Sequence, residues 1–380
     1  IEMLSELYWK LWANFVEYLN GEFAISVYDK IKHKLLLFRD RYGTKPLYYS
    51  MKDNQLLFST ELWSFIQETS KLNQKNIYNH MIFGFWISPE SLLHWVYSIV
   101  PWTYIAYNWV DVQTIKYSHY ITSETQEANF METLENSIIR RIPQYQNSVF
   151  VALSWWLDSS IIALFLKKHF DGEIIAYSFQ SSQNKEDIEI ASYNARKLWF
   201  KYHILEIHPD DFDWEHEWLV HLPNLYKVIR SKLPQYKDIK VEFWGDGKEE
   251  LFQINSNFNI ENINSKYDLL YQKWLIWNYT IDRKFLNTSM LDYNLQMIDK
   301  MSLRYGIERR MPFLDYELLQ FKRYKKHSDD MKEMLLKHWL RYSQKKYAYS
   351  DGIWFSYHTK EKEILQNAKS LLEILKSTYL

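Results

Sequence analysis

Strand-like and helix-like segments alternate along the chain between residues 128 and 207, and this alternation restricts the fold more than any other feature. Successive strands joined by helices pair in parallel, because a helical crossover returns the chain to the same end of the sheet. The pattern predicts an α/β domain with a parallel sheet over residues 128–380. Its expected elements are a helix at 128–141, a strand at 148–153, a helix at 159–169, a strand at 173–179, a helix at 186–199 and a strand at 202–207.

Residues 1–120 follow a different pattern. The stretches "EFAISVYDKIKHKLLLFRDRY" (22–42) and "PLYYSMKDNQLLFST" (46–60) each hold two β-rich runs around a polar centre, which is typical of a β-hairpin. The segment predicts an antiparallel α+β domain that ends before a boundary at 117–129. Helices are expected at 2–18 and near 61–68.

Composition excludes several classes of function. The net charge is −1 and there is no basic stripe, so the chain is not expected to bind nucleic acid. Its apolar runs are far shorter than the ~20 residues that span a bilayer, and we expect a cytoplasmic protein. There is no cysteine and no HxxxH or HExxH spacing, which excludes disulfides and argues against zinc. Because the chain opens at Ile1 without an initiator Met, we expect a missing amino-terminal part.

The segment "SWWLDSS" (154–160) joins an expected strand to an expected helix. Backbone N–H groups and the helix dipole at such a junction favour a phosphate group, and the serine hydroxyls add donors. An ordinary helix N-cap is the alternative, because serine and aspartate cap many helices. Trp155 and Trp156 oppose the phosphate interpretation, since close approach of a phosphate requires small residues.

Three further segments carry chemistry-bearing residues. In "VEFWGDGKEELF" (241–252), acids open a helix after a strand, which suits Mg²⁺ beside a phosphate or merely complements a helix dipole. The segment 301–321, which contains "GIERRMPFLD", taken alone is interpreted as a structural loop with ion pairs. On the amphipathic helix "MKEMLLKHWLR" (331–341), Lys332 could reach a phosphate or remain on a solvated face.

Taken in this order, these segments resemble the glutamine-hydrolysing asparagine synthetases. "SWWLDSS" resembles the SGGLDSS pyrophosphate loop of that family, "WGDGKEELF" its second nucleotide motif, and "GIERRMPFLD" its G-x-E-x-R-x-PFLD segment. "IRSKLPQY" (229–236) and "KKYAYSDGIWFSY" (345–357) are similar to further family segments. "LNGEFAISVYD" and "FRDRYGTKPLYY" look like late strands of the class II glutaminase domain. The resemblance implies a PP-loop synthetase domain at 128–380, preceded by a partial Ntn-type glutaminase domain at 1–120.

The resemblance also implies an activity. ATP would adenylate aspartate to give β-aspartyl-AMP, and ammonia derived from glutamine in the full-length protein would convert this intermediate to asparagine. ATP and Mg²⁺ would be the cofactors, and a homodimer is left open. By motif, the pyrophosphate and nucleotide would meet Leu153, Ser154, Trp155, Trp156, Asp158, Ser159, Ser160, Phe179, Trp244 and Gly245. Asp246, Arg230 and Lys332 would be catalytic, and Asp158 and Glu249 would face Mg²⁺.

Tryptophan stands where the family pattern has glycine at seven positions, which are Trp12, Trp102, Trp109, Trp155, Trp156, Trp199 and Trp354. Glycine is correspondingly scarce, with 8 residues of 380 against 17 tryptophans. The common glycine content of about 7% would give roughly 27. Our hypothesis is that UGA codons read as glycine in the source organism have been decoded here as tryptophan. The nucleotide sequence at these positions would decide it.

Three departures from the family pattern leave alternatives open. The expected glutaminase nucleophile is an amino-terminal cysteine, and the chain contains none. The span between Pro234 and the strand at 241 is shorter than in the family, and Gln253 and Ile254 replace glycines. A related ligase acting on another carboxylic acid therefore stays open. So does a catalytically degenerate remnant that serves as an interaction protein.

Overall fold

The chain forms two compact units. One comprises residues 1–120, 255–297 and 361–380, and the other comprises residues 121–254 and 298–360. The computed structural model describes residues 2–52, 55–67, 70–76, 86, 88–117, 129–154, 156–180, 185–207, 225–248, 295–321 and 326–342.

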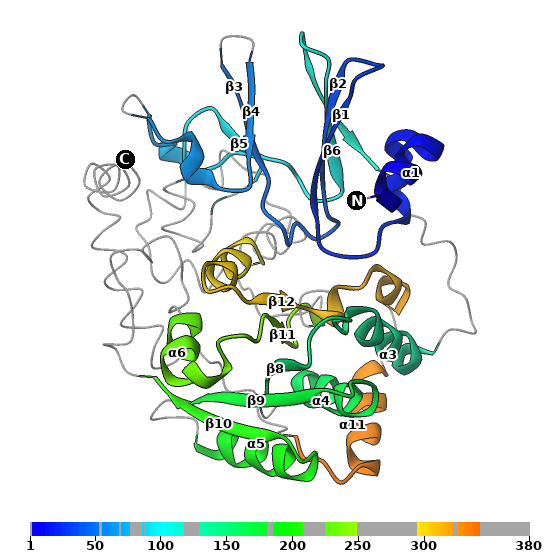
Figure 1. The fold of residues 1–380 in the computed structure, drawn as a ribbon, viewed down its shortest axis with the longest axis vertical. Coiled ribbons are helices and arrows are strands. Elements are labelled where there is room, and N and C mark those ends of the chain that lie inside the picture. Colours follow the sequence, from blue (N-terminus) through cyan, green and yellow to red (C-terminus); the bar gives the residue numbers. More distant parts are fainter. Residues whose placement is uncertain are drawn as a thin grey trace, which may run out of the picture. The chain divides into compact units, whose positions relative to one another are not determined.

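The first unit is antiparallel, as its paired β-rich runs predict (Figure 1). One sheet has the order β1-β2-β6-β7 and the other the order β4-β3-β5. The strands are β1 (Ala24–Asp29), β2 (Lys34–Arg39), β3 (Tyr48–Lys52), β4 (Gln55–Ser59), β5 (Val96–Ser98), β6 (Thr103–Tyr107) and β7 (Val112–Lys116). The helices are α1 (Glu2–Leu11) and the 3-10 helices η1 (Trp12–Tyr18) and η2 (Leu62–Phe65).

A buried arginine connects the two sheets of this unit. Arg39 ends β2, and its guanidinium donates hydrogen bonds to Ser98 Oγ of β5 at 2.8 Å and to the carbonyl oxygen of Ile99 at 2.6 Å. It also donates to the carbonyl oxygens of Gly43 and Lys45, at 2.6 and 3.0 Å. A buried charge with this many acceptors fixes the path of the chain between the sheets.

The second unit is built on a five-stranded parallel sheet with the order β10-β9-β8-β11-β12, which confirms the predicted fold class. Its strands are β8 (Ser148–Ala152), β9 (Glu173–Gln180), β10 (Lys201–Glu206), β11 (Val241–Phe243) and β12 (Glu308–Arg310). Its helices include α3 (Phe130–Arg141), α4 (Leu157–His169), α5 (Lys185–Lys197), α6 (Leu225–Lys232) and α11 (His327–Lys337). The 3-10 helices are η4 (Pro234–Tyr236), η5 (Pro312–Leu314) and η6 (Tyr316–Phe321).

Helices cover both faces of this sheet (Figure 1). Phe150 of β8, Ile175 of β9 and Leu205 of β10 pack with Tyr226 and Ile229 of α6 in one apolar cluster. The crossovers through α4 and α5 lead from β8 outward to β10, whereas the crossover through α6 returns past β8 to β11. Right-handed crossovers that run in opposite directions place their helices on opposite faces. The strand order therefore reverses direction beside β8, and such switch points are where open α/β sheets bind ligands.

Tryptophan occupies the left-handed backbone region at six described positions. These are Trp12, Trp95, Trp102, Trp109, Trp199 and Trp339, with φ between 51° and 71°. His33 is the other non-glycine residue with positive φ in the described part of the chain. Bulky residues rarely adopt this conformation, and glycine adopts it freely.

The backbone thus has a conformation typical of glycine at Trp12, Trp102, Trp109 and Trp199, four of the positions that the sequence singles out. Trp95 and Trp339 extend the set. Trp156 has a φ of −77°, which any residue adopts. Trp155 and Trp354 lie outside the described residues.

Two expected helices in the first unit are wrong in part. The α-helix expected at 2–18 stops at Leu11 because Trp12, with a φ of 51°, breaks the right-handed path, and a 3-10 helix follows. The helix expected at 61–68 is a single 3-10 turn over Leu62–Phe65. Within the described ranges, no helix has the length and apolar character needed to cross a membrane.

Candidate functional site

The loop between β8 and α4 is held together by its own serines. Ser159 Oγ accepts a hydrogen bond from the backbone N–H of Ser154 at 3.0 Å and lies 2.8 Å from Ser154 Oγ. The Ser154 hydroxyl in turn accepts the N–H of Trp156 at 3.1 Å. These contacts fold the chain tightly at the amino end of α4, where N–H groups and the helix dipole favour an anion.

A pocket of about 260 Å³ opens beside this loop. It lies past the carboxyl ends of β8, β9 and β11, at the switch point of the sheet. Nine of its lining residues are sequence-predicted site residues, namely Leu153, Ser154, Trp156, Asp158, Ser159, Phe179, Trp244, Gly245 and Asp246. Ala152, Tyr177 and Ser178 complete the wall. The motifs that are separate in sequence therefore converge on one cavity.

Gly245 allows β11 and α4 to approach each other closely. A Cβ at this position would lie 2.9 Å from the Cβ of Asp158 and 3.2 Å from the backbone nitrogen of Ser159. Backbone and a buried side chain give way little at such distances. A glycine is thus required to bring the two nucleotide motifs together.

Asp158 pairs with a lysine that was not among the predicted site residues. Lys248 Nζ lies 2.8 Å from Asp158 Oδ1, and both side chains are almost fully buried, with 5% and 7% exposed. An ammonium group at the carboxylate takes the place that a divalent cation would need. The described residues also contain no group of three or more His, Asp or Glu side chains that could hold a metal ion. Of the two predicted Mg²⁺ ligands, Asp158 is thus paired with Lys248, and Glu249 lies outside the described residues.

A second charged pair joins the pocket wall at Asp246 to a residue that does not line the pocket. The guanidinium of Arg309 contacts the carboxylate of Asp246 and lies over the ring of Trp244, 3.5 Å from its centroid. Glu242 is buried nearby and accepts hydrogen bonds from the hydroxyls of Tyr177 and Tyr226. Burial raises the pKa of Glu242 to about 8, against the opposing effect of the Arg309 charge.

Three predicted site residues do not line the pocket. Ser160 is fully buried, and its hydroxyl accepts a hydrogen bond from Asn194 Nδ2 at 3.1 Å. Asn194 also exchanges two hydrogen bonds with the backbone of Arg341, at 2.7 and 2.8 Å. Arg230 donates to backbone carbonyl oxygens, including those of Tyr305 and Ile239 at 2.9 Å each. Ser160 therefore anchors the loop from behind, and Arg230 anchors the chain around residues 236–239.

Lys332 is half-exposed on α11 and pairs with Asp329 at 3.0 Å. Its assignment to a phosphate depends on the sequence resemblance alone. Trp155 lies outside the described residues.

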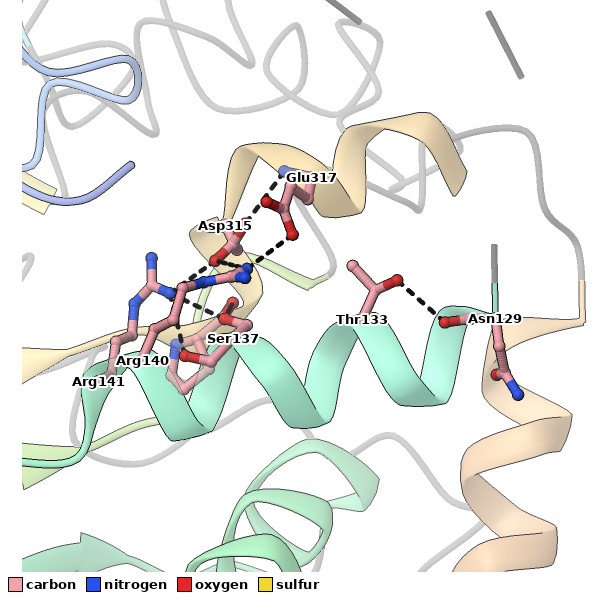
Figure 2. A network of polar contacts seen from close by, with 8 residues as sticks. Asn129, Thr133, Ser137, Arg140, Arg141, Asp315 and Glu317 are labelled. Atoms are coloured by element: carbon pink, nitrogen blue, oxygen red, sulfur yellow. Dashed lines mark hydrogen bonds and ion pairs between the residues drawn. The ribbon is translucent and has the colours of Figure 1, made fainter. Parts of the chain in front are cut away.

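The segment that contains "MPFLD" is held by ion pairs, as its sequence predicts. Figure 2 shows Asp315 between two arginines of α3, with Oδ2 at 2.8 Å from Arg140 and 2.9 Å from Arg141. Arg140 also pairs with Glu317 at 2.8 Å. Ser137 of the same helix donates to the carbonyl oxygen of Pro312 at 2.7 Å. This network fixes the chain after β12, the strand that carries Arg309.

The fold and site define an α/β protein whose pocket lies at the switch point of a parallel sheet and whose amino-terminal unit is antiparallel. The glutamine amidotransferase domain family matches residues 1–120, and the asparagine synthase family matches residues 129–259 and 279–354. The latter match covers more than half of the chain, which belongs to the asparagine synthase family.

Curated relatives agree with this placement. Asparagine synthetase [glutamine-hydrolyzing] 2 of Bacillus subtilis is 23% identical over an alignment 406 residues long. The alignment covers 84% of this chain and 53% of the relative. Asparagine synthetase B [glutamine-hydrolyzing] of Escherichia coli is 24% identical over 344 residues, which cover 84% and 56%. The chain thus spans about half the length of these relatives. The solved U34-tRNA thiolase NcsA from Methanococcus maripaludis is 16% identical, with 70% of this chain and 83% of that chain covered, at a TM-score of 0.34.

Proposed function

We propose that this chain carries the synthetase site of an ATP-dependent ligase that converts aspartate to asparagine. One observation carries the proposal. Residues from the two nucleotide motifs, 154–159 and 244–246, and from the end of β9 line a single pocket at the carboxyl ends of β8, β9 and β11. Membership of the asparagine synthase family supports the same chemistry.

In the proposed reaction, a side-chain carboxylate oxygen of aspartate attacks the α-phosphorus of ATP. The new acyl–phosphate bond gives β-aspartyl-AMP, and the bond to the β-phosphate breaks to release pyrophosphate. Ammonia then attacks the acyl carbon, AMP leaves, and the nitrogen loses a proton to give the amide. The serine-held loop at Ser154 and the amino end of α4 would bind the departing pyrophosphate, since negative charge accumulates there.

We assign the nucleotide to the walls formed by Leu153, Phe179 and Gly245, and we assign Asp246 to the reacting end of the pocket. The segment 1–120 is proposed to be part of a class II amidotransferase domain. Because the chain has no cysteine, its residues do not include the nucleophile of such a domain. Ammonium is therefore the nitrogen source for a test of this chain.

Trp156 lines the pocket and takes up volume there. We expect the chain with tryptophan at 155 and 156 to bind ATP poorly. Trp155→Gly combined with Trp156→Gly should restore binding and give aspartate-dependent ATP–pyrophosphate exchange, because the loop regains room for phosphate. Exchange should rise by about tenfold or more, on the scale of one or more restored charge-assisted contacts.

Trp199→Gly serves as the matched control, since it removes an exposed indole that is not among the residues lining the pocket and should leave exchange unchanged. A panel of acids tests the substrate. Exchange driven by an acid other than aspartate would replace the substrate assignment and keep the ligase. Absence of exchange with every acid, in a folded double variant, would favour the degenerate remnant. Tight ATP binding by the unaltered chain would contradict the steric argument.

A further inference from the structure

A buried arginine lies directly behind the pocket without lining it. Arg309 on β12 is the register partner of Glu242 on β11. Trp244, which follows β11, packs against the apolar cluster that contains Tyr177 and Tyr226, the hydroxyl partners of Glu242, so Glu242 and Trp244 lie on one face of the sheet. Arg309 lies over the Trp244 ring, which places its guanidinium on that face as well. The sequence pattern G-x-E-x-R-x-PFLD leaves position 309 unspecified, so the resemblance assigns no role to this residue.

Several groups confine the Arg309 guanidinium. Its side chain is 5% exposed. Burial raises the pKa values of Glu242 and Tyr226, and the positive charge of Arg309 opposes that rise. Tyr226 itself is tied to Glu242 by a hydrogen bond of 2.8 Å from its hydroxyl to Oε2. A charge buried in this way cannot turn toward water, so its direction is set by the surrounding groups.

Two described partners of Arg309 line the pocket, the ring of Trp244 and the carboxylate of Asp246, and of these two only Asp246 is charged. The carboxylate of Asp246 accepts a hydrogen bond from Arg309 Nη2 and is 36% exposed. A charge-assisted hydrogen bond from a confined donor restricts the rotation of the acceptor. The arginine therefore acts on the pocket through this carboxylate, whereas Asp246 can touch a bound molecule directly.

We propose that Arg309 is a positioning residue that fixes the carboxylate of Asp246 at the reacting end of the pocket, with burial and the ring of Trp244 confining the guanidinium. The inference rests on the proposed function, because it assigns to Asp246 a contact with the reacting acid or its adenylate. Catalytic groups displaced by about 1 Å lose on the order of 10²-fold in rate, which gives such an anchor a measurable effect.

The test is a double-mutant cycle on ATP–pyrophosphate exchange with aspartate, in the full chain with glycine at 155 and 156. Arg309→Met should lower kcat about 100-fold with KM for ATP changed less than about threefold, since Leu153, Phe179 and Gly245, to which the nucleotide is assigned, are unaltered. Asp246→Asn should cause a similar loss. The double variant should be no slower than Asp246→Asn alone, because both changes remove one interaction. Arg304→Met, an exposed arginine of the same unit, is the matched control and should retain the parent rate.

Additive losses in the double variant would overturn the inference, and so would an unchanged kcat in folded Arg309→Met. If Arg309→Met does not fold, Arg309→Lys carries the test, because it keeps the charge but lacks the planar fork. It should fold and lose about tenfold in kcat at constant KM, and a parental kcat would again overturn the inference.

A parent that shows no exchange with any acid would count against the proposed function instead. A crystal structure of the Arg309 variant then decides the positioning separately. A displaced Asp246 carboxylate supports the inference, and an unmoved one overturns it.

Discussion

At the scale of single residues, two tryptophans occupy the place where helices most often end in glycine. After α5, Phe200 N–H bonds the carbonyl oxygen of Ala195 at 3.0 Å and Trp199 N–H bonds that of Arg196 at 3.2 Å. After α11, Leu340 and Trp339 make the same pair of bonds to Leu335 and Leu336, at 2.9 and 3.0 Å. This is the Schellman motif, whose left-handed residue is commonly glycine.

The indoles gain little from these positions, since Trp199 is 88% exposed and Trp339 is 76% exposed. Trp199→Gly and Trp339→Gly should each raise the free energy of unfolding by about 1 kcal/mol, because they relieve a left-handed strain of about 1–2 kcal/mol and lose some of that gain to a freer unfolded chain. Urea denaturation measures the change. Trp199→Ala keeps the Cβ and should gain much less. A loss of stability in both glycine variants would contradict the glycine assignment of these positions.

At the scale of elements, β11 carries a glutamate in the middle of the sheet. The folded state raises the pKa of Glu242 to about 8 from an ordinary 4.5, chiefly through burial. A raised pKa means that the folded chain holds the proton more tightly than the unfolded chain does. The resulting stabilisation is present in full below about pH 4.5 and is lost as the pH rises through 8.

The free energy of unfolding should therefore fall between pH 5 and 8, with this group contributing a slope of up to about 1.4 kcal/mol per pH unit. Glu242→Gln stays neutral throughout and should remove that contribution. The stability of the variant minus that of the parent should therefore be larger at pH 8 than at pH 5. Denaturant titrations at several pH values measure both slopes. Identical slopes in the two chains would show that Glu242 does not titrate in this interval.

Most elements could be predicted from the sequence, because each depends on local patterns. Alternating β-rich runs predict β1 to β4, and the strand–helix alternation predicts β8 to β10 with α3 to α5. The predicted bounds differ by one or two residues, as with α4, which begins at Leu157 and not at 159. The break of α1 at Trp12 could not be predicted from helix patterns, since it depends on one backbone angle.

At the scale of the whole molecule, the Asp315 network joins segments about 175 residues apart within the second unit (Figure 2). Asp315 is fully buried, whereas Glu317, which pairs with the same Arg140, is 40% exposed. Asp315→Asn should lower the free energy of unfolding by about 3 kcal/mol, because it leaves Arg141 buried without its counter-charge. Glu317→Gln should cost less than about 1 kcal/mol, as exposed pairs do. Thermal or urea unfolding compares them, and equal effects would contradict this division of roles.

The candidate site is predictable to the extent that its residues follow strand ends. Ser154 and Gly245 follow β8 and β11, Phe179 lies near the carboxyl end of β9, and parallel strands bring their carboxyl ends to one edge. Lys248 and Arg309 could not be found in this way. Their contacts depend on the register of β11 and β12 and on the approach of α4, which local sequence does not encode.

The hydrogen bonds between Asn194, Ser160 and the backbone of Arg341 have a consequence for ligand binding. They clamp the first turn of α4 from the side away from the pocket, so this turn is already ordered before any anion arrives. Less of the binding free energy is then spent on restricting the protein, and more of it remains as affinity.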